Sequence, residues 1–363
     1  MQVKVLTGVR AVDRAAWDAL VGDGTPFCEW DLLAALEEAG CVGGDTGWHP
    51  APVTVWDGDR LVGAAPAYVK EHSFGEYVYD WRIAHWVHQQ GRRWYPKLVV
   101  AVPYNPVQGA RLLVAPDAPR EAVVARLVEG LLAAGADLPG VHVLFPDERD
   151  AADCVARGAS LRLQAQYHWH NRGWRTFEGW LAALPSKRRT MIRRERRAVE
   201  GVRVEVVEAP PAGLAGDLWG FYRDTYVRHT GETGYLNAAF FEILCARWAH
   251  RIHVVLARDG GRPIAGTFNV RKGDRLYGRW WGASRDVPFL HFEVAIYAAV
   301  EWCIREGVAA FEPGHGGEHK RARGFEPVLT RSTHWQRDAD IHVALRAFYE
   351  REAHVVRASL GEP

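Results

Sequence analysis

The sequence predicts a mixed α/β fold in which two similar domains follow one another along the chain. In both halves, short runs with strand-like alternation are separated by stretches of helical periodicity. A short pattern is also repeated: Ala156-Arg157-Gly158, nine residues, His168-Trp169 recurs as Ala322-Arg323-Gly324, nine residues, His334-Trp335. Both copies fall at the same point in the predicted order of elements, which indicates a duplicated domain.

Composition is that of an ordinary globular protein. The 363 residues are enough for two domains, and 48% are hydrophobic and 25% charged. We expect no membrane span and no targeting signal, because no long apolar run and no apolar N-terminal core are present. Five scattered cysteines favour reduced thiols in the cytoplasm, and a net charge of +1 gives no global attraction to nucleic acid.

The first half predicts helices, a hairpin and a crossover. The Asp57-Gly58 turn between two alternating apolar runs is a strong hairpin signal. The expected elements are two helices within 12–40, the hairpin 53–69, strand 111–114, helix 120–136, strand 141–145, helix 150–156 and strand 164–170.

The second half predicts the same order. Its hairpin surrounds Asp259-Gly260-Gly261. The expected elements are helices over most of 177–198 and 214–249, the hairpin 254–270, strand 276–281, helix 290–306, strand 308–311 and strand 330–336. We place the boundary near Asn171–Gly173, which gives domains 1–170 and 171–363. One strand–helix–strand crossover pairs its strands in parallel, and it should be right-handed.

The main candidate site is the stretch Gly307–Pro327, where an apolar strand runs into a glycine-rich, charged loop. Ligands in open α/β sheets bind at the carboxyl ends of strands. Glu312 or Glu318 could act as a base, and His315 or His319 as a base or an acid, although each could instead position a substrate. We therefore name four catalytic candidates: Glu312, His315, Glu318 and His319.

A second candidate is the basic stretch Lys187–Arg197, which holds seven basic residues and one glutamate. On a helix it forms a cationic stripe beside an apolar face, which suits a phosphate group and equally fits a solvated surface. The anion-binding candidates are Lys187, Arg188, Arg189, Arg193, Lys320 and Arg323.

The aromatic block 72–104 is a long insertion relative to the second half. Some of its side chains are expected to line an acceptor pocket between the domains. In the second half, alternation along strand 276–281 places Arg279 and Trp281 on one face and Trp280 on the other. The substrate-binding candidates are Glu76, Tyr79, Asp80, Trp81, Tyr104, Arg279, Trp281, His291 and Glu293.

Several strings carry a family resemblance: EHSFGEYVYDW at 71–81, VPYNPVQGARLL at 102–113, LYGRWWGA at 276–283 and FEPGHGGEHKRARGFEP at 311–327. The element order resembles the GNAT acyltransferase fold, and its duplication resembles the FemAB branch. The sequence is most similar to the FemAB-like predicted N-acyltransferases of peptidoglycan biosynthesis/recognition. This resemblance implies transfer of an acyl group from an activated donor to an amine.

The resemblance leaves the donor open. FemAB relatives use aminoacyl-tRNA and most other GNAT enzymes use acyl-CoA, through an R/Q-x-x-G-x-G/A loop. The corresponding segments here, SRDVPFLHF at 284–292 and APDAPREAV at 115–123, lack glycines to cradle a phosphate. We expect no permanently bound cofactor, a small-molecule or peptide amine as acceptor, and aminoacyl-tRNA, acyl-CoA or an acyl-carrier protein thioester as donor.

Two other functions stay open on the sequence. His315 and His319 fit the H-x-x-E-H spelling of a zinc hydrolase, which needs both imidazoles on one helix face although glycines separate them. A non-catalytic module that binds an anion through Lys187–Arg197 is the second alternative. We predict no metal site.

Overall fold

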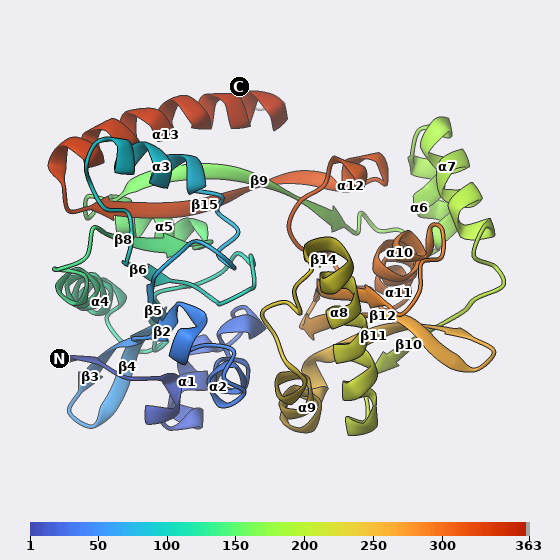
Figure 1. The fold of residues 1–363 in the computed structure, drawn as a ribbon, viewed down its shortest axis with the longest axis horizontal. Coiled ribbons are helices and arrows are strands. Elements are labelled where there is room, and N and C mark those ends of the chain that lie inside the picture. Colours follow the sequence, from blue (N-terminus) through green and yellow to red (C-terminus); the bar gives the residue numbers. More distant parts are fainter. Residues whose placement is uncertain (361–363) are drawn as a thin grey trace. The chain divides into compact units, whose positions relative to one another are not determined.

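The computed structural model describes residues 1–360, whose contacts divide the chain into two units (Figure 1). Unit 1 comprises residues 1–165 and 329–360, and unit 2 comprises residues 166–328. This division differs from the boundary after residue 170, because the segment after residue 328 contacts the N-terminal residues. Its strand β15 (Glu326–Gln336) pairs with β8 (Gly140–Leu144) from Ser332 to Gln336.

Unit 1 contains two sheets. The larger runs in the order β15-β8-β6-β5-β2, and β6 and β8 are its parallel pair. The smaller sheet runs β1-β3-β4-β7 and is antiparallel. The strands are β1 (Gln2–Val5), β2 (Trp48–Pro50), β3 (Val53–Asp57), β4 (Arg60–Ala65), β5 (Ala67–Lys70), β6 (Lys97–Val100) and β7 (Leu113–Val114).

Unit 2 contains one sheet in the order β10-β11-β12-β13-β14-β9. β13 and β14 are parallel, and the other pairs are antiparallel. The strands are β10 (Arg203–Glu208), β11 (Ile252–Asp259), β12 (Arg262–Lys272), β13 (Arg275–Ala283), β14 (Ala310–Glu312) and the end of β9 (Ser160–His170).

The two units repeat one order of strands. In each, an N-terminal strand flanks a hairpin, and a parallel pair with an antiparallel strand beside it follows; in unit 1 the hairpin and the parallel pair lie in different sheets, and in unit 2 they lie in one. The final strand is exchanged: β9, from the first half, ends beside β14, and β15, from the second half, ends beside β8. The repeated His-Trp pairs lie on these strands, so Trp169 packs in the core of unit 2 and Trp335 in that of unit 1. The predicted tandem mixed α/β fold is confirmed.

Helices cover the sheets in both units. Unit 1 has α1 (Arg14–Val21), α2 (Trp30–Glu38), α3 (Trp81–Gln89), α4 (Arg120–Ala134), α5 (Glu148–Val155) and α13 (Ala339–Leu360). Unit 2 has α6 (Phe177–Ala183), α7 (Ser186–Arg197), α8 (Ala215–Thr230), α9 (Ala238–Arg247), α10 (Leu290–Phe292), the π-helical turn η6 (Glu293–Tyr297), α11 (Ala298–Arg305) and α12 (Glu318–Ala322). The predicted helices are present, whereas α3, α13, β1, β2, β6 and β10 were not predicted. The expected first-half crossover from strand 111–114 is wrong, because β7 pairs with β4 and the parallel neighbour of β8 is β6.

Each unit has its own hydrophobic core. In unit 1, Leu127 and Val128 of α4 pack on the strand residues Val53, Val100 and Val143. A separate cluster joins α3 to α13, which lie side by side (Figure 1). The core of unit 2 surrounds large aromatic side chains, among them Trp169, Trp180, Trp302 and Phe311. No helix among the described residues is both long and apolar enough to cross a membrane.

A close approach of α8 to β13 provides a test of this packing. A Cβ atom on Gly282 would lie 1.9 Å from the carbonyl oxygen of Phe221, whereas one on Gly266, its partner on β12, would meet its nearest atom at 3.4 Å. We expect Gly282→Ala to lower the free energy of unfolding by at least about 1–3 kcal/mol, because the strand must shift. Gly266→Ala, the matched control, should change it by less than about 0.5 kcal/mol. Urea unfolding followed by circular dichroism measures both, and equal effects would contradict this packing.

Candidate active site

In unit 2 the pairing of the two parallel strands ends early. β14 pairs with β13 only from Ala310 to Glu312, while β13 continues to Ala283. The chain then turns into the loop 313–317. Gly314 has φ 84°, and a Cβ there would lie 3.2 Å from the carbonyl oxygen of Gly278, so this position favours glycine. Glu312 and this loop therefore lie at the carboxyl ends of the two parallel strands, where open α/β sheets bind ligands.

Glu312 ends β14 and is 4% exposed. Its Oε1 accepts a hydrogen bond from Nη1 of Arg275 at 3.1 Å. Its Oε2 has no hydrogen-bond partner among the described residues and lies 3.9 Å from Nε2 of His168. Burial raises the pKa of Glu312, an effect that Arg279 and Arg275 partly oppose. A buried carboxylate with one open oxygen and a raised pKa is suited to accepting a proton.

His168 reaches the same place from β9. Burial, with the nearby charges of His170 and the arginines, lowers its pKa to about 3, so the imidazole is neutral. Its Nε2 lies 3.3 Å from Oε1 of Gln166. The sequence had marked His168 only as part of the repeat, because its neighbour Glu312 is far away along the chain.

Lys320, on α12, is also buried. Its Nζ donates hydrogen bonds to the carbonyl oxygens of Gly314 at 2.7 Å and His315 at 3.1 Å. Burial and the charge of Arg279 lower its pKa to about 7. Lys320 therefore stabilises the loop and can gain or lose a proton near neutral pH. The sequence had predicted only that it binds an anion.

Three further histidines lie in this region. Burial lowers the pKa of His291 and His315 to about 4 each, and it lowers that of His319. The rings of His291 and His319 are 6.4 Å apart, and that of Trp281 is 5.0 Å from His291. Trp281 and His291 line a pocket of about 520 Å³. The side chain of Glu318 lies outside the described part of the structure.

Strand β13 places its aromatic residues as predicted, on opposite faces. Trp280 packs among Phe240, Phe241 and Phe268, whereas Trp281 packs beside His291. Arg279 lies at a bulge in the pairing with β12 and its Nη1 approaches the carbonyl oxygen of Glu312 at 3.5 Å. The positive charge of Arg279 acts to lower the pKa of both Glu312 and Lys320.

Arg323, named from the sequence as an anion holder, is instead buried in an ion pair. Its Nη2 lies 2.7 Å from Oε1 of Glu195, and its Nε donates to the Tyr297 hydroxyl at 2.8 Å. The guanidinium also stacks on Phe292. These contacts join α12 to α7 and occupy the donors that an anion would need.

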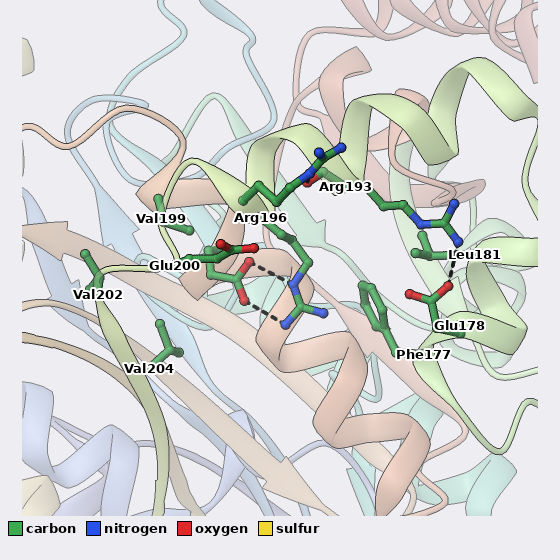
Figure 2. Close-up of a pocket in the computed structure, with 11 residues that line it drawn as sticks. Phe177, Glu178, Leu181, Arg193, Arg196, Val199, Glu200, Val202 and Val204 are labelled. Atoms are coloured by element: carbon green, nitrogen blue, oxygen red, sulfur yellow. Dashed lines mark hydrogen bonds and ion pairs between the residues drawn. The ribbon is translucent and has the colours of Figure 1, made fainter.

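Glu293, predicted to bind substrate, is likewise held in an ion pair. Both of its oxygens accept hydrogen bonds from Arg196, at 3.0 and 3.1 Å. This pair lies in a pocket of about 530 Å³ formed by α6, α7, β10 and η6. Arg193 on the same pocket pairs with Glu178 at 2.6 Å (Figure 2). Because Arg193 and Arg196 already have carboxylate partners, Arg197, whose Nε donates to the carbonyl oxygen of Arg193, is the one arginine of this pocket without an ion pair among the described residues, so the pocket offers little to an incoming anion.

The remaining basic side chains of α7 gather elsewhere. Arg189 donates to the carbonyl oxygen of Leu184 at 2.6 Å. Another pocket, of about 670 Å³, is lined by Thr190, Met191, Ala322 and four cations, Lys187, Arg188, Arg194 and Arg321. We call it the basic pocket. Among the described residues no carboxylate lines it, and none of the four cations forms an ion pair with them. Arg194 was not predicted as a member.

The first-half candidates separate into two groups. Glu76 and Asp80 are buried against Lys97, while Tyr79 and Trp81 are exposed. Tyr104 is buried, and its hydroxyl donates to the carbonyl oxygen of Cys41 at 2.7 Å. An acceptor pocket between the domains stays a prediction.

The described residues offer no ligand set for the zinc hydrolase alternative. Among them, no three His, Cys, Asp or Glu side chains lie close enough together to hold a metal ion. His315 lies in the loop and His319 in α12, so the two do not share a helix face.

The Glu195–Arg323 pair can be tested by removing one partner. Arg323→Met leaves Glu195 buried without its countercharge, and we expect a loss of about 3–5 kcal/mol in the free energy of unfolding. Arg321→Met, two residues away and exposed, is the matched control and should be near neutral. Calorimetry measures both. An unchanged Arg323→Met variant would show that the pair does not fix α12.

Several solved structures share this fold. The FemX crystal structure superposes with a TM-score of 0.54 at 10% identity, covering 95% of this chain and 100% of that one. The C-terminal domain of a putative lysylphosphatidylglycerol synthetase from Agrobacterium fabrum gives 0.54 at 13%, covering 91% and 93%. L-PGS from Bacillus licheniformis gives 0.50 at 13%, covering 88% and 95%. The comparison with curated proteins gives no match.

The family comparison covers nearly the whole chain. Residues 8–362 match the FemAB-like family, whose description is peptidoglycan biosynthesis/recognition. The solved structures, all at low identity, agree with this in fold. The repeated order of elements in the two units is the tandem GNAT-like architecture that the sequence predicted. The chain therefore belongs to the FemAB-like family.

Proposed function

We propose that this protein is an N-acyltransferase of peptidoglycan biosynthesis, which moves an acyl or aminoacyl group from an activated donor to an amine. Family and fold support a transferase role in that process. The observation that carries the proposal is the end of β14, where Oε2 of buried Glu312 has no hydrogen-bond partner among the described residues and nearby Lys320 has a pKa of about 7.

In the proposed reaction, Glu312 and Lys320 each transfer one proton. The acceptor amine attacks the donor carbonyl carbon, a C–N bond forms, and the bond from that carbon to the leaving oxygen or sulfur breaks. Oε2 of Glu312 takes the proton that the amine loses, which its raised pKa favours. The ammonium of Lys320 gives a proton to the leaving atom, and its lowered pKa makes that transfer easier.

We infer that the basic pocket holds phosphate groups of the donor. Aminoacyl-tRNA, acyl-CoA and an acyl-carrier thioester all carry them. Arg321 of this pocket directly follows Lys320, the proposed proton donor, on α12. The pocket would replace the glycine-rich phosphate loop that the sequence lacks. The reaction needs no permanently bound cofactor, and these donors belong to the cytoplasm.

Replacing the proposed base provides the first test. Glu312→Gln keeps the size of the side chain but cannot accept the proton, so we expect transfer to fall by about 10²–10⁴-fold. Glu326→Gln, a half-exposed carboxylate of unit 2 that pairs with Arg172, is the control and should retain activity. Mass spectrometry follows product formation with a panel of the three donor classes and amine acceptors. Equal turnover of Glu312→Gln and the parent protein would refute the assignment.

A second test uses pH. Lys320 is an ammonium below its pKa of about 7 and neutral above it, so a reaction that needs its proton slows as the pH rises through 7. Lys320→Arg stays charged throughout this range, and we expect this alkaline decline to disappear from kcat/KM even if the rate is lower. A decline that persists unchanged in Lys320→Arg would assign it to another group.

A further inference from the structure

A half-exposed arginine of β13 holds one side of the buried carboxylate of Glu312. Strand pairing places Tyr277 beside Glu312, so Arg275, two residues earlier, lies on the same face of β13. Nη1 of Arg275 donates to Oε1 of Glu312 at 3.1 Å, and 50% of the Arg275 side chain is exposed. Oε2 lies 3.9 Å from Nε2 of His168, which is too far for a hydrogen bond. The two oxygens of the carboxylate therefore have different surroundings.

This difference decides where the carboxylate takes a proton. An oxygen that already accepts from a guanidinium is a poor site for a proton, so the proton goes to the other oxygen. Among the described residues, the charged and titratable groups that face Glu312 are Arg275 and Arg279 from β13 and His168 from β9. Of these three, Arg275 hydrogen-bonds the carboxylate, whereas Nη1 of Arg279 approaches the backbone carbonyl oxygen of Glu312. Arg275 is therefore the group that distinguishes the two oxygens.

The repeat allows the same place to be found in unit 1. Trp169 and Trp335 are counterparts in the two sheets, and each is paired with a residue that has a parallel neighbour. Residues of the two units can therefore be matched by counting from these tryptophans through the strand pairings. The counterparts of Arg275, Glu312 and His168 are Lys97, His142 and His334. Both units thus carry a cation at one strand position, but the carboxylate next to it is replaced by an imidazole in unit 1.

The cation has a different role in unit 1. Nζ of Lys97 lies 2.8 Å from Oε2 of Glu76 and 2.6 Å from Oδ2 of Asp80. Nδ1 of His142 lies 2.6 Å from Nδ1 of His334, so these two buried imidazoles bond to each other rather than to the lysine. The arrangement of a cation that holds one oxygen of a strand-end carboxylate is therefore specific to unit 2, where we place the reaction.

We propose that Arg275 is a positioning residue of the transfer reaction: by holding Oε1 of Glu312, it directs the proton that the carboxylate accepts to Oε2. This inference rests on the proposed function and adds to it the residue that selects the reacting oxygen. The charge of Arg275 also opposes the effect of burial on the pKa of Glu312. Removing that charge raises the pKa, so that Glu312 is protonated, and unable to act as a base, up to a higher pH.

The test is the pH dependence of kcat/KM for the intact protein, measured with the donor and amine that support transfer. In Arg275→Met we expect the acid limb, which reports the ionisation of Glu312, to move to higher pH. The plateau should fall by about 10–100-fold, because the carboxylate is no longer held in place. The alkaline limb should stay, since Arg279 rather than Arg275 acts on Lys320. Arg275→Lys keeps the charge, so its acid limb should lie closer to that of the parent protein.

Two further variants separate this effect from a general loss of charge. Arg279→Met removes the charge that acts on both Glu312 and Lys320, so both limbs should move to higher pH. Arg203→Met removes an exposed arginine of β10 that pairs with Glu205, and it should move neither limb.

A second measurement needs no substrate. Carbon-13 NMR of glutamate-labelled protein follows the titration of Glu312, whose signal is identified by its loss in Glu312→Gln. Arg275→Met should raise the pKa of Glu312, and Arg203→Met should leave it unchanged. Because the Arg275 side chain is half-exposed, the Arg275→Met variant should fold.

An unchanged pKa of Glu312 in Arg275→Met would overturn the proposal, as would equal shifts in Arg203→Met. An acid limb that moves as far in Arg275→Lys as in Arg275→Met would also overturn it. If Glu312→Gln loses transfer while Arg275→Met keeps the parent profile, the positioning role is wrong and the transferase function stands. If Arg275→Met raises the pKa but no donor supports transfer, the hold of Arg275 on the carboxylate stands and the transferase function is wrong.

Discussion

The ion pair between Glu195 and Arg323 is the contact on which the arrangement of unit 2 depends. It joins α7, a strongly cationic helix, to α12, a helix of only five residues that follows a glycine-rich loop. So short a helix has little stability of its own. Held by Arg323, it directs Lys320 toward the carbonyl oxygens of the loop 313–317 and Arg321 into the basic pocket. Because the pair is desolvated, its main contribution is to geometry rather than to stability.

Two buried lysines show how countercharges decide the chemistry available to a side chain. Lys97 contacts two carboxylates, which raise its pKa and keep it an ammonium. Lys320 contacts only carbonyl oxygens, with Arg279 nearby, and its pKa falls to about 7. The first lysine is therefore locked in a structural role, while the second is able to exchange protons. Residue type and burial are alike, and the difference comes from the partners.

Local patterns in the sequence were enough to predict the hairpins, the crossover of the second half, the tandem repeat and the charged strand end at Glu312, whereas the first-half crossover starts from β6, which was not predicted. Contacts between distant residues were not accessible in this way. Arg323 looked like an anion holder because its partner Glu195 lies 128 positions away. His168 meets Glu312 only after β9 pairs with β14. The aromatic segment 72–81 has neither a helical nor a strand period, so its division into buried charges and exposed rings follows from folding around Lys97.

The exchange of β9 and β15 has a consequence for the origin of the chain. If each half descends from one ancestral copy, that copy ended in a strand that completes the sheet of another copy. Such a polypeptide would have left its own sheet open as a monomer and closed it by trading strands in a symmetric pair. Gene fusion would then have turned a swapped homodimer into a single chain, after which the two sheets were able to diverge while each still relied on the other half for its last strand.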